Sequence, residues 1–403
     1  MSSKVKNSFD YLVIGAGIIG LSIARDLRNR FPSAEIAILE KEPDVAFHSS
    51  GRNSGVLHSG FYYTADSLKA RFTRDGNRQM REYCYDNNLK INESKKVVVA
   101  KDASELPALF ELEKRGITNG VEVKIIDEKE LAEIDPNIKT FKHALWSPMT
   151  ATVDPGEVSR AIKSELKQKE VRFFLNEGYA ARHEGNKIRT THGNIFEATK
   201  LINAAGLYAD RVARDFGFSK RYTIIPFKGI YLRYTGNKNP VRTNVFPVPN
   251  LKNPFLGVHY TVTVDGHVKI GPTSMPAFWR ENYAGFGGFR PGEITGILTK
   301  EAKLFIRNSF GFRSLAIEEI KKYNRRYFTS LAASMVHELD VKGFTDWGKP
   351  GIRAQLLDIT TDELVMDFII EGDSASTHVL NAVSPAFTCA FPFSKHVIDN
   401  YIV

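Results

Sequence analysis

Tyr11-Leu-Val-Ile-Gly-Ala-Gly-Ile-Ile-Gly20 is the stretch of sequence that decides the fold. Its first four residues are apolar and predict a short buried strand of a parallel sheet. The three glycines that follow have the spacing GxGxxG, and residues 18–30 have the pattern of a helix. A second predicted strand, at residues 35–39, completes a βαβ unit. We therefore expect a dinucleotide-binding α/β fold.

Each glycine of this motif has its own physical role. Gly15 permits the tight turn after the strand, Gly17 lets the backbone approach a pyrophosphate, and Gly20 allows close packing of the helix. The N-terminus of that helix offers backbone N–H groups to phosphates. Glu40 ends the second strand about twenty residues later, where its carboxylate would accept hydrogen bonds from ribose hydroxyls.

Two further segments favour FAD over NAD. Residues 48–58 form a small, polar loop whose hydroxyl, amide and backbone N–H groups suit a pyrophosphate and a flavin. Residues 201–206, Leu-Ile-Asn-Ala-Ala-Gly, predict a strand that ends in small residues, as close approach of the backbone to a cofactor requires. An ordinary surface loop and a plain strand-to-helix turn are the simpler alternatives for these two segments.

The order of predicted strands and helices divides the chain into five parts. Residues 1–88, 146–220 and 344–403 have α/β patterns, and we assign them to a discontinuous, Rossmann-like FAD-binding domain. Residues 89–145 and 221–343 interrupt this pattern, the second with strands and turns followed by a long helical stretch. We assign both insertions to an α+β substrate domain with a mainly antiparallel sheet.

The composition excludes several classes of protein. Of the 403 residues, 42% are hydrophobic and 25% are charged, as is typical of a globular protein. Two cysteines are too few for a disulfide framework, and no run approaches the ~18 apolar residues of a membrane span. Neither metal-ligand spacing nor a nucleic-acid-binding motif occurs. We therefore expect no metal site, no nucleic-acid partner and a cytoplasmic location.

The basic residues are more numerous than the acidic ones. The 55 lysines and arginines against 46 acidic residues give a formal net charge of +9, and the densest basic run lies at residues 300–326. A solvated helical face is the simpler interpretation of this run. Peripheral contact with the cytoplasmic face of an anionic membrane is the alternative.

Taken together, these motifs resemble the D-amino-acid oxidase / glycine oxidase superfamily of flavoenzymes. The glycine motif with Glu40, residues 49–58 and Asn203-Ala-Ala-Gly206 carry this resemblance. Further segments are similar to the L-2-hydroxyglutarate oxidase/dehydrogenase family within it, namely residues 53–63, Pro226-Phe-Lys-Gly229, Gly257-Val-His-Tyr260, Gly351-Ile-Arg-Ala-Gln355 and residues 381–386. Lys228 stands where an arginine is expected in that family, so the positive charge is kept but the planar fork is not.

The resemblance implies FAD as cofactor and oxidation of a 2-hydroxy dicarboxylic acid, L-2-hydroxyglutarate, to 2-oxoglutarate. The first turn of the last predicted helix would place N–H groups that stabilise negative charge on the reduced flavin, although simple capping also explains its proline. The residues implied to contact FAD are Gly15, Gly17, Ile18, Ile19, Gly20, Glu40, Lys41, Ser50, Asn53, Ser54, Gly55, Val56, Tyr179, Ala205, Gly206, Gly351, Pro385, Ala386 and Phe387.

Oxidation of such an alcohol needs a cation for the carboxylate and a base for the hydroxyl proton. Arg353 is our candidate for the cation, because arginine binds a carboxylate through two parallel hydrogen bonds. Gln355, which would share a strand face with Arg353, and Tyr260 are further candidate substrate contacts. The candidates for a second carboxylate of the substrate, which the sequence does not rank, are Lys228, Arg52 and Arg71.

Histidine suits the role of base at neutral pH, and His58 and His259 are the two candidates. His58 follows the loop that is expected to run along the cofactor, so it would contact the flavin. His259 lies on a predicted strand of the substrate domain, from which a base can reach the hydroxyl proton. We therefore favour His259, and a nearby cation such as Arg353 would lower its pKa and keep it neutral.

Two other functions remain open at this point. One is an amino-acid or secondary-amine oxidase on the same scaffold, and the other is a non-catalytic flavin- or nucleotide-binding module. Binding alone does not require an arginine and two histidines of this kind, which favours an enzyme. Oxygen, a quinone and a protein carrier are all open as electron acceptors.

Overall fold

The structure is a computed structural model that describes residues 7–65, 67–249, 257–382 and 384–403. The chain forms two compact units, each assembled from segments that are far apart in the sequence. Unit 1 contains Met1–Gly51, Pro155–Ile224 and Ala354–Val403, and unit 2 contains Arg52–Asp154 and Ile225–Arg353.

Unit 1 is built on an eight-stranded mixed sheet. Its strands are β1 (Ser8–Ile14), β2 (Ile36–Leu39), β9 (Arg172–Phe174), β10 (Tyr179–Arg182), β11 (Lys187–Thr190), β12 (Ile195–Asn203), β22 (Ile369–Gly372) and β23 (Ser376–Asn381). The strand order is β10-β11-β12-β1-β2-β9. The first part of β12 pairs with β11 and its last residues pair with β23, which in turn pairs with β22.

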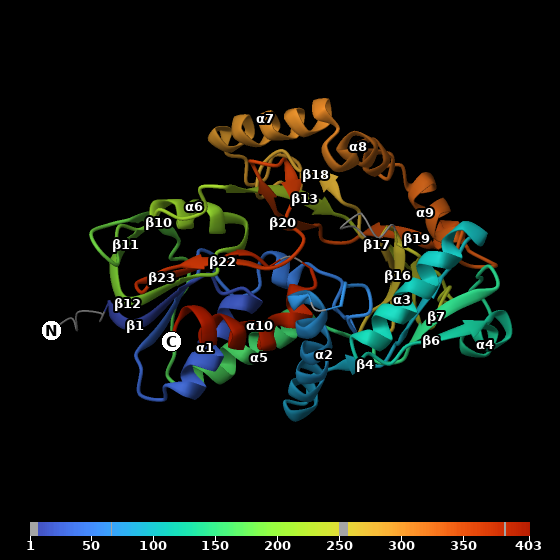
Figure 1. Ribbon diagram of the computed structural model, residues 1–403, viewed down its shortest axis with the longest axis horizontal. Helices are drawn as coiled ribbons and strands as arrows, with labels where there is room; N and C mark the ends of the chain where they lie inside the picture. The colour runs from blue at the N-terminus through green and yellow to red at the C-terminus, as the bar shows by residue number, and fades with distance from the viewer. Residues whose placement is uncertain (1–6, 66, 250–256, 383) are drawn as a thin grey trace. The chain divides into compact units, whose positions relative to one another are not determined.

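The centre of this sheet is parallel, as the βαβ pattern predicted. β1 lies between β2 and β12 and is parallel to both, and the hydrophobic side chains of these strands are buried. The helices of the unit are α1 (Ile18–Arg30), α5 (Pro155–Gln168), α6 (Ala209–Asp215) and α10 (Ala386–Tyr401). Figure 1 shows α1, α5 and α10 together on one side of the sheet and α6 on the other. Burial on both faces explains why these strands are continuous apolar runs.

Unit 2 contains a second eight-stranded sheet, in the order β19-β14-β17-β16-β15-β5-β7-β6. Its strands are β5 (Lys96–Val99), β6 (Lys124–Asp127), β7 (His143–Ser147), β14 (Leu232–Tyr234), β15 (Asn244–Pro247), β16 (His259–Val262), β17 (Val268–Gly271) and β19 (Phe344–Trp347). Only the pair β5–β15 is parallel among the strand pairs described for this sheet. The prediction of a mainly antiparallel substrate domain is therefore confirmed.

The remaining elements of unit 2 surround this sheet. A small sheet joins β3 (Val56–Leu57), β8 (Ala151–Val153) and β4 (Ile91–Asn92), and β18 (Met275–Pro276) pairs with β13 (Tyr222–Gly229). The helices are α2 (Leu68–Asp86), α3 (Leu106–Thr118), α4 (Glu128–Ile134), α7 (Pro291–Arg307), α8 (Phe312–Lys321) and α9 (Arg325–Ala333). β13 and β20 (Gly351–Asp358) carry the chain between the units, and β21 (Glu363–Leu364) pairs with β20 in unit 1.

The two faces of the large sheet of unit 2 differ in character. Because side chains alternate along a strand, Val97, Val245 and Tyr260 face one side, where they join a hydrophobic core cluster. Lys96 and His259 face the other side of the sheet, where both side chains are buried although lysine is a charged residue and histidine a polar one. This polar face of the sheet is where the candidate catalytic residues gather.

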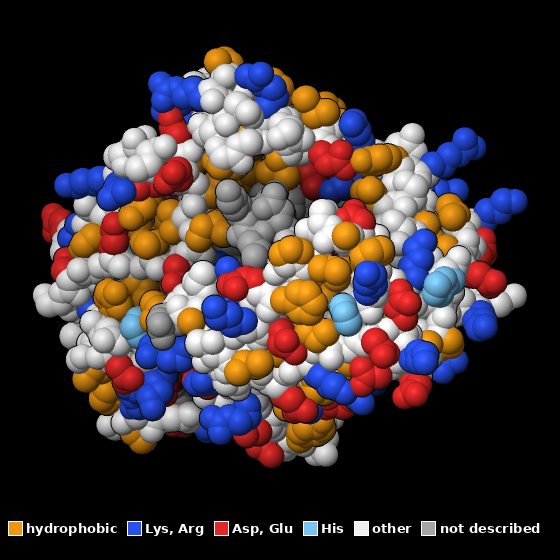
Figure 2. Space-filling view, turned by 45° about the vertical axis from the view of Figure 1, so that its right-hand side comes forward, with side chains coloured by type: hydrophobic (Ala, Val, Ile, Leu, Met, Phe, Trp, Pro, Cys, Tyr) orange, Lys and Arg blue, Asp and Glu red, His pale blue; other side chains and the backbone are white. Residues whose placement is uncertain are grey.

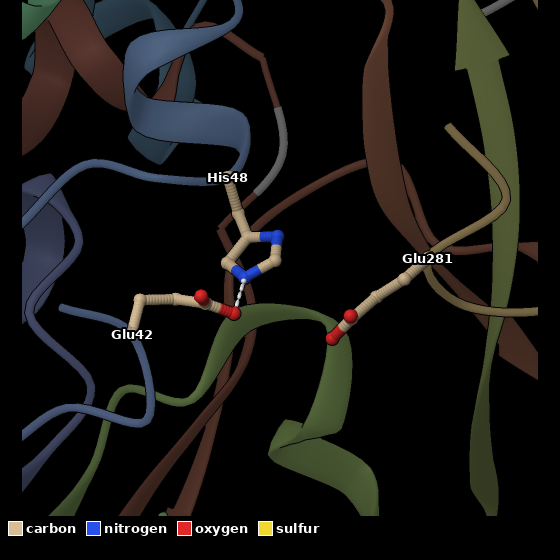
Figure 3. Close-up of side chains that lie close together, drawn as sticks. All are labelled: Glu42, His48 and Glu281. Atoms are coloured by element: carbon tan, nitrogen blue, oxygen red, sulfur yellow. Dashed lines mark hydrogen bonds and ion pairs between the residues drawn. The ribbon is translucent and has the colours of Figure 1, made fainter. Parts of the chain in front are cut away.

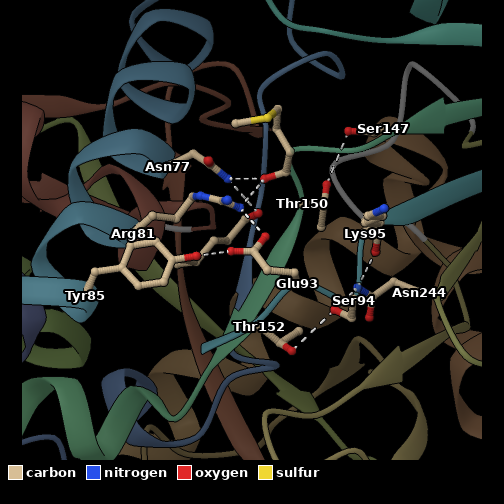
Figure 4. A network of polar contacts seen from close by, with 12 residues as sticks. Asn77, Arg81, Tyr85, Glu93, Ser94, Lys95, Ser147, Thr150, Thr152 and Asn244 are labelled. Carbon is tan, nitrogen blue, oxygen red and sulfur yellow. Dashed lines mark hydrogen bonds and ion pairs between the residues drawn. The ribbon is translucent and has the colours of Figure 1, made fainter. Parts of the chain in front are cut away.

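The first boundary between the units differs from the predicted one. The sequence assigned residues 1–88 to the first domain, whereas the contacts end the first segment of unit 1 at Gly51 and place Arg52–Asp154 in unit 2. α2 explains the difference, because Asn77 on α2, labelled in Figure 4, lies in a polar network of unit 2. It donates hydrogen bonds to the carbonyl oxygens of Leu57, His58 and Met149. The later boundaries also move, to residues 154/155, 224/225 and 353/354.

Helices were predicted more accurately than strands. The helix expected at residues 18–30 has the bounds of α1, and the strand expected to carry Arg353 and Gln355 is β20, but the hairpin of β10 and β11 was not expected. Of the strand expected at residues 254–262, the structure gives β16, while residues 254–256 lie outside the described part of the chain, as does Val383. No helix in the described part of the chain has the length and apolar character needed to cross a bilayer.

Candidate active site

The glycine-rich turn between β1 and α1 excludes side chains at its first and third glycines. Gly15 has a φ of +103°, and a Cβ atom at this residue would lie 2.6 Å from the carbonyl oxygen of Ala204. A Cβ atom on Gly20 would collide with the carbonyl oxygen of Gly15. The close approach of β1, α1 and the end of β12 therefore requires these glycines.

The N-terminus of α1 is shaped to hold an anion. Gly17 is the N-cap residue and supplies no side chain to the first turn. Instead, the Ser50 Oγ accepts a hydrogen bond of 2.8 Å from the backbone N–H of Ile18. The Ser50 hydroxyl therefore lies at the N-terminus of α1, where a phosphate would be expected to bind at a dinucleotide-binding turn.

The carboxylate of Glu40 holds the same turn from the other side. Its Oε2 accepts from the Ala16 N–H at 2.7 Å, and its Oε1 accepts from the Glu42 N–H at 3.0 Å. Burial raises the pKa of Glu40, although both N–H donors favour the charged form. A carboxylate has about four acceptor positions. Two of them therefore remain for hydroxyl groups of a ribose, so the residues present fit a dinucleotide.

Lys41, the residue after Glu40, forms a polar cluster with Glu42 and His48. His48 points toward Glu42 in Figure 3. Its Nε2 lies 2.9 Å from the Oε1 of Glu42 and 2.8 Å from the Nζ of Lys41. Lys41 also donates to Glu42 and lies over the ring of Tyr208, 5.8 Å from its centroid. Burial opposes ionisation of Glu42, but the hydrogen bonds from Lys41 and His48 lower the pKa of Glu42 below its usual value. The lysine is therefore held in place rather than extended into solvent.

The other implied FAD contacts are divided between the units. In unit 1, the Ala205 N–H donates to Asn203 Oδ1 at 3.1 Å, Gly206 has a φ of +53°, and Tyr179 donates to Asp215 at 2.7 Å. Pro385 is the N-cap residue of α10 and provides no side-chain hydrogen bond to its first turn. The implied contacts that belong to unit 2 are Asn53, Ser54, Gly55, Val56 and Gly351.

In unit 2, the segment before β3 is a tight polar turn. Asn53 Oδ1 accepts from the Gly55 N–H at 2.9 Å, and Ser54 Oγ accepts from the Val56 N–H at 3.3 Å. A Cβ atom on Gly351 would collide with the carbonyl oxygen of Arg52. Glycine at position 351 is therefore required by close backbone packing.

His259 lies on β16 and is held as a neutral imidazole. Its Nδ1 is 3.0 Å from the carbonyl oxygen of Gly257, and its ring stacks on Phe246 with centroids 3.7 Å apart. Because a carbonyl oxygen only accepts, Nδ1 carries the proton and Nε2 keeps its lone pair. Burial lowers the pKa of His259 to about 3, and the cations of Lys96 and Arg353 act in the same direction. The predicted effect of Arg353 is confirmed, although burial is the larger cause.

His58 follows β3 and lies beside the same aromatic ring. It is 8% exposed, its ring is edge-on to Phe246 at 6.4 Å, and its Nδ1 lies 3.4 Å from the Nζ of Lys96. Burial holds the pKa of His58 well below its ordinary value, and Lys96, His259 and Arg353 lower it further. The structure therefore brings together both histidines that the sequence singled out.

Arg353 lies on β20 close to these histidines. It is half-buried, and one of its terminal nitrogens donates to Ser274 Oγ at 3.2 Å. Its charge lowers the pKa of both His58 and His259, in the same direction as burial. In such an arrangement the cation can bind a carboxylate, and a neutral imidazole can take the proton of a neighbouring hydroxyl.

Three other candidates lie elsewhere. Tyr260 is fully buried in the hydrophobic core on the opposite face of β16 from His259. Gln355 donates its amide to the carbonyl oxygen of Val365 at 2.8 Å within unit 1, and Arg71 is exposed on α2. Lys228 is 9% exposed on β13, and it pairs with Met275, the residue after the Ser274 that Arg353 contacts. These contacts link Lys228 to the surroundings of Arg353.

Sequence reasoning did not single out Lys96. The neighbouring lysines 95 and 96 suggest an exposed strand end, yet Lys96 is fully buried and Lys95 is exposed. Strand alternation alone does not identify it, because β5 is buried on both of its faces.

The chain is similar to a family of flavoenzymes along nearly its whole length. The family described as "FAD dependent oxidoreductase" (DAO) matches residues 10–399. The L-2-hydroxyglutarate dehydrogenase of Escherichia coli K12 is 33% identical, over 97% of this chain and 92% of the relative. The human mitochondrial L-2-hydroxyglutarate dehydrogenase is 32% identical, over 98% of this chain and 89% of the relative.

Solved structures share the fold at lower sequence identity. The L-alpha-glycerophosphate oxidase of Mycoplasma pneumoniae, solved with FAD bound, has a TM-score of 0.74 and 21% identity, covering 98% of this chain and 94% of that one. The glycine oxidase of Geobacillus kaustophilus has a TM-score of 0.70 and 16% identity, with coverage of 98% and 94%. These two likenesses concern the fold alone.

Proposed function

Because the chain belongs to the DAO family of FAD-dependent oxidoreductases, we propose that it oxidises L-2-hydroxyglutarate to 2-oxoglutarate. Its cofactor is FAD and its substrate is a small molecule. The substrate assignment rests on full-length relatives with this activity in their names and on the chemistry of unit 2. The single observation that carries it is the pair of buried imidazoles, His58 and His259, on the ring of Phe246, whose pKa values are lowered by burial and further by the charge of Arg353.

In this proposal Arg353 binds and orients the substrate. A 2-hydroxy acid carries a carboxylate next to the carbon that is oxidised, and the planar guanidinium can hold that carboxylate through two hydrogen bonds. Ser274 Oγ, which accepts from Arg353, helps to fix the direction of the guanidinium group. Two-point binding restricts the orientation of the alcohol, which is what positions its C–H and O–H bonds for reaction.

His259 is the proposed base. Its Nε2 lone pair takes the proton of the substrate hydroxyl, while the bond from Nδ1 to Gly257 keeps the imidazole in this tautomer. FAD, when bound, supplies the acceptor for the hydride that leaves the carbon. The products are a 2-oxo acid, an imidazolium and the reduced cofactor, so charge and electrons balance.

Lys228 is the proposed partner of the second carboxylate of the substrate. It is a nearly buried cation, and burial lowers the pKa of Lys228. Lys228 pairs across the strands with Met275, which follows Ser274, the residue whose hydroxyl accepts a hydrogen bond from Arg353. Arg52 is less suited, because it already stacks on Tyr283 at 4.4 Å and donates to the carbonyl oxygen of Pro350. Two cations near one another match a dicarboxylate.

Flavin bleaching tests the proposed function. The purified protein, supplied with FAD, is expected to have the two visible absorption bands of oxidised flavin, and anaerobic L-2-hydroxyglutarate is expected to remove the band near ~450 nm. Glycine and sarcosine are the matched comparison substrates. Faster bleaching by either amine would make the chain an amine oxidase, and no bleaching by any 2-hydroxy or 2-amino acid would leave only a binding role. Reoxidation with oxygen or a soluble quinone then identifies the acceptor class.

We also propose that unit 2 contacts an anionic membrane through residues 300–326. In this region hydrophobic and basic side chains lie close together over α7 and α8, at the top of Figure 2. The exposed apolar residues of these helices and their connections are Leu298, Phe305, Ile306, Phe310, Ile317, Ile320 and Tyr323. Apolar side chains that insert and cations that bind lipid phosphates are the features of a peripheral membrane surface. A quinone would then be the accessible acceptor.

Vesicle co-sedimentation tests this membrane contact. The protein is expected to bind vesicles that contain anionic lipid, to bind neutral vesicles poorly, and to dissociate as the salt concentration rises. Ile306→Glu, at a side chain that is 74% exposed, should lower the partition coefficient by about ten- to a hundredfold, because one inserted side chain contributes roughly 1.5–3 kcal/mol. Ile117→Glu, on α3 with 65% exposure, is the control. Equal loss in both variants would exclude this surface.

A further inference from the structure

Lys96 is a fully buried lysine in an aromatic enclosure. Its side chain is 0% exposed, and its Nζ lies 4.3 Å from the ring centroid of Phe246, 5.0 Å from that of Tyr62 and 5.3 Å from that of Phe61. Among the residues that the structure describes, no carboxylate forms an ion pair with it. An ammonium ion buried without a carboxylate is costly, and cation–π contacts offset only part of that cost.

The contact between Lys96 and His58 determines which nitrogen of His58 carries a proton. The Lys96 Nζ is 3.4 Å from His58 Nδ1. An ammonium group has three donors and no acceptor, so Nδ1 must accept and the proton of the neutral imidazole must be on Nε2. His259 has the opposite arrangement, because its Nδ1 donates to Gly257. One imidazole therefore presents an N–H group at Nε2 and the other presents a lone pair.

We propose that Lys96 is a positioning residue that fixes His58 as a hydrogen-bond donor at Nε2, next to the base His259. His58 then donates to an oxygen of the substrate, and His259 receives the hydroxyl proton. The two histidines are thereby prevented from exchanging roles. This inference depends on the proposed function only in treating the cluster as the substrate site, since the tautomer of His58 exists whichever substrate is bound.

The charge of Lys96 makes this arrangement dependent on pH. Burial lowers the pKa of Lys96 to about 7. Above that pH a neutral amine can accept a hydrogen bond from Nδ1, which releases His58 into its other tautomer. Among the described residues, the charged and titratable groups that act on the pair or lie against it include His259, Arg353 and Tyr62. The fraction of molecules with His58 as a donor at Nε2 is therefore expected to fall as the pH rises through about 7.

Nuclear magnetic resonance of the holoenzyme labelled with ¹⁵N-histidine tests the proposal directly. At pH 6, His58 is expected to have an unprotonated Nδ1 and a protonated Nε2, with His58→Gln used to assign its signals. Between pH 6 and 9 the two nitrogens should shift toward a mixture of tautomers. Lys96→Arg, whose guanidinium stays charged, should keep the donor tautomer throughout. A proton on Nδ1 at pH 6, or a tautomer that Lys96→Met leaves unchanged, would overturn the proposal.

Activity provides the second measurement. Wild-type kcat/KM is expected to fall above about pH 7, Lys96→Arg should remove that fall, and Lys96→Met should have a rate lower by about tenfold that is flat with pH, as expected for the loss of one oriented hydrogen bond. Lys95→Met, at the exposed neighbour, is the matched control and should behave as wild type. A Lys96→Met enzyme with the wild-type pH profile would contradict the positioning role even if its absolute rate were lower.

Stability separates this role from a structural one. The folded pKa of Lys96 lies below its ordinary value of 10.5, so the folded protein binds fewer protons than the unfolded chain between about pH 7 and 10.5. Its contribution to stability therefore rises with pH in that window. Lys96→Met should raise Tm at pH 6–7, because an apolar side chain replaces a buried charge that has no carboxylate. A large drop in Tm would instead make Lys96 a structural residue. If L-2-hydroxyglutarate failed to bleach the flavin, the proposed function would fall while the tautomer result stood.

Discussion

Arg353→Ala is expected to lower kcat/KM for L-2-hydroxyglutarate by roughly 30- to 5,000-fold. This corresponds to a loss of about 2–5 kcal/mol of transition-state stabilisation. The large effect follows because the substrate carboxylate would enter a buried site and find no partner. Arg353→Lys should recover only part of the loss, since a lysine ammonium lacks the planar fork. Steady-state kinetics on variants with equal flavin content give the measurement.

The control for this variant is Arg233→Ala. Arg233 lies on β14 in the same unit and forms an exposed ion pair with Asp346, with side-chain exposures of 53% and 51%. Exposed ion pairs contribute little to stability, so this variant should retain wild-type kinetics. An unchanged kcat/KM in Arg353→Ala would remove Arg353 from the substrate site and leave the cation to be sought elsewhere.

His259→Gln is expected to lower kcat by about 10²- to 10⁴-fold while the protein keeps its FAD. The pKa of His259 is about 3, so the imidazole of the wild type is already neutral throughout pH 6–9 and its titration should not limit the rate there. The loss in the variant should be partly recovered at high pH, where hydroxide can replace the base. Single-turnover reduction of the flavin at several pH values measures this directly.

His58→Gln is the comparison for that experiment. With His58 as a donor and His259 as the base, His58→Gln should lose less rate than His259→Gln, because a glutamine amide can still donate a hydrogen bond. Normal turnover in His259→Gln together with a flavin-loaded but inactive His58→Gln would exchange the two roles.

The cofactor half of the chain was predictable from sequence because its signals are local. The strand, glycine turn and helix of residues 11–30 are contiguous, and Gly15 and Gly20 are required by backbone contacts within the same unit. Local propensity and spacing carry this kind of information without reference to the rest of the fold.

The chemistry around His259 was only partly predictable because it depends on strand pairing across long sequence distances. Lys96 is buried because β5 pairs with β15 and β7, and nothing near residue 96 in the sequence reveals those partners. Tyr260 was expected at the substrate, but the register of β16 turns it into the hydrophobic core. A one-residue change in register exchanges the two faces of a strand, so single-sequence reasoning cannot assign them.

The pairing of β12 with β23 has a consequence for how the protein is made. β12 already has its neighbours β1 and β11 when residue 203 has been synthesised, but the last residues of β12 gain their remaining partner only with Ser376–Asn381. The nascent chain must therefore emerge almost completely from the ribosome before the cofactor-binding sheet can close. Until then the last residues of β12 present an open strand edge. Any premature stop before residue 376 removes the strand that completes the sheet, so C-terminal truncation is predicted to abolish flavin binding even though the glycine motif lies at the opposite end of the chain.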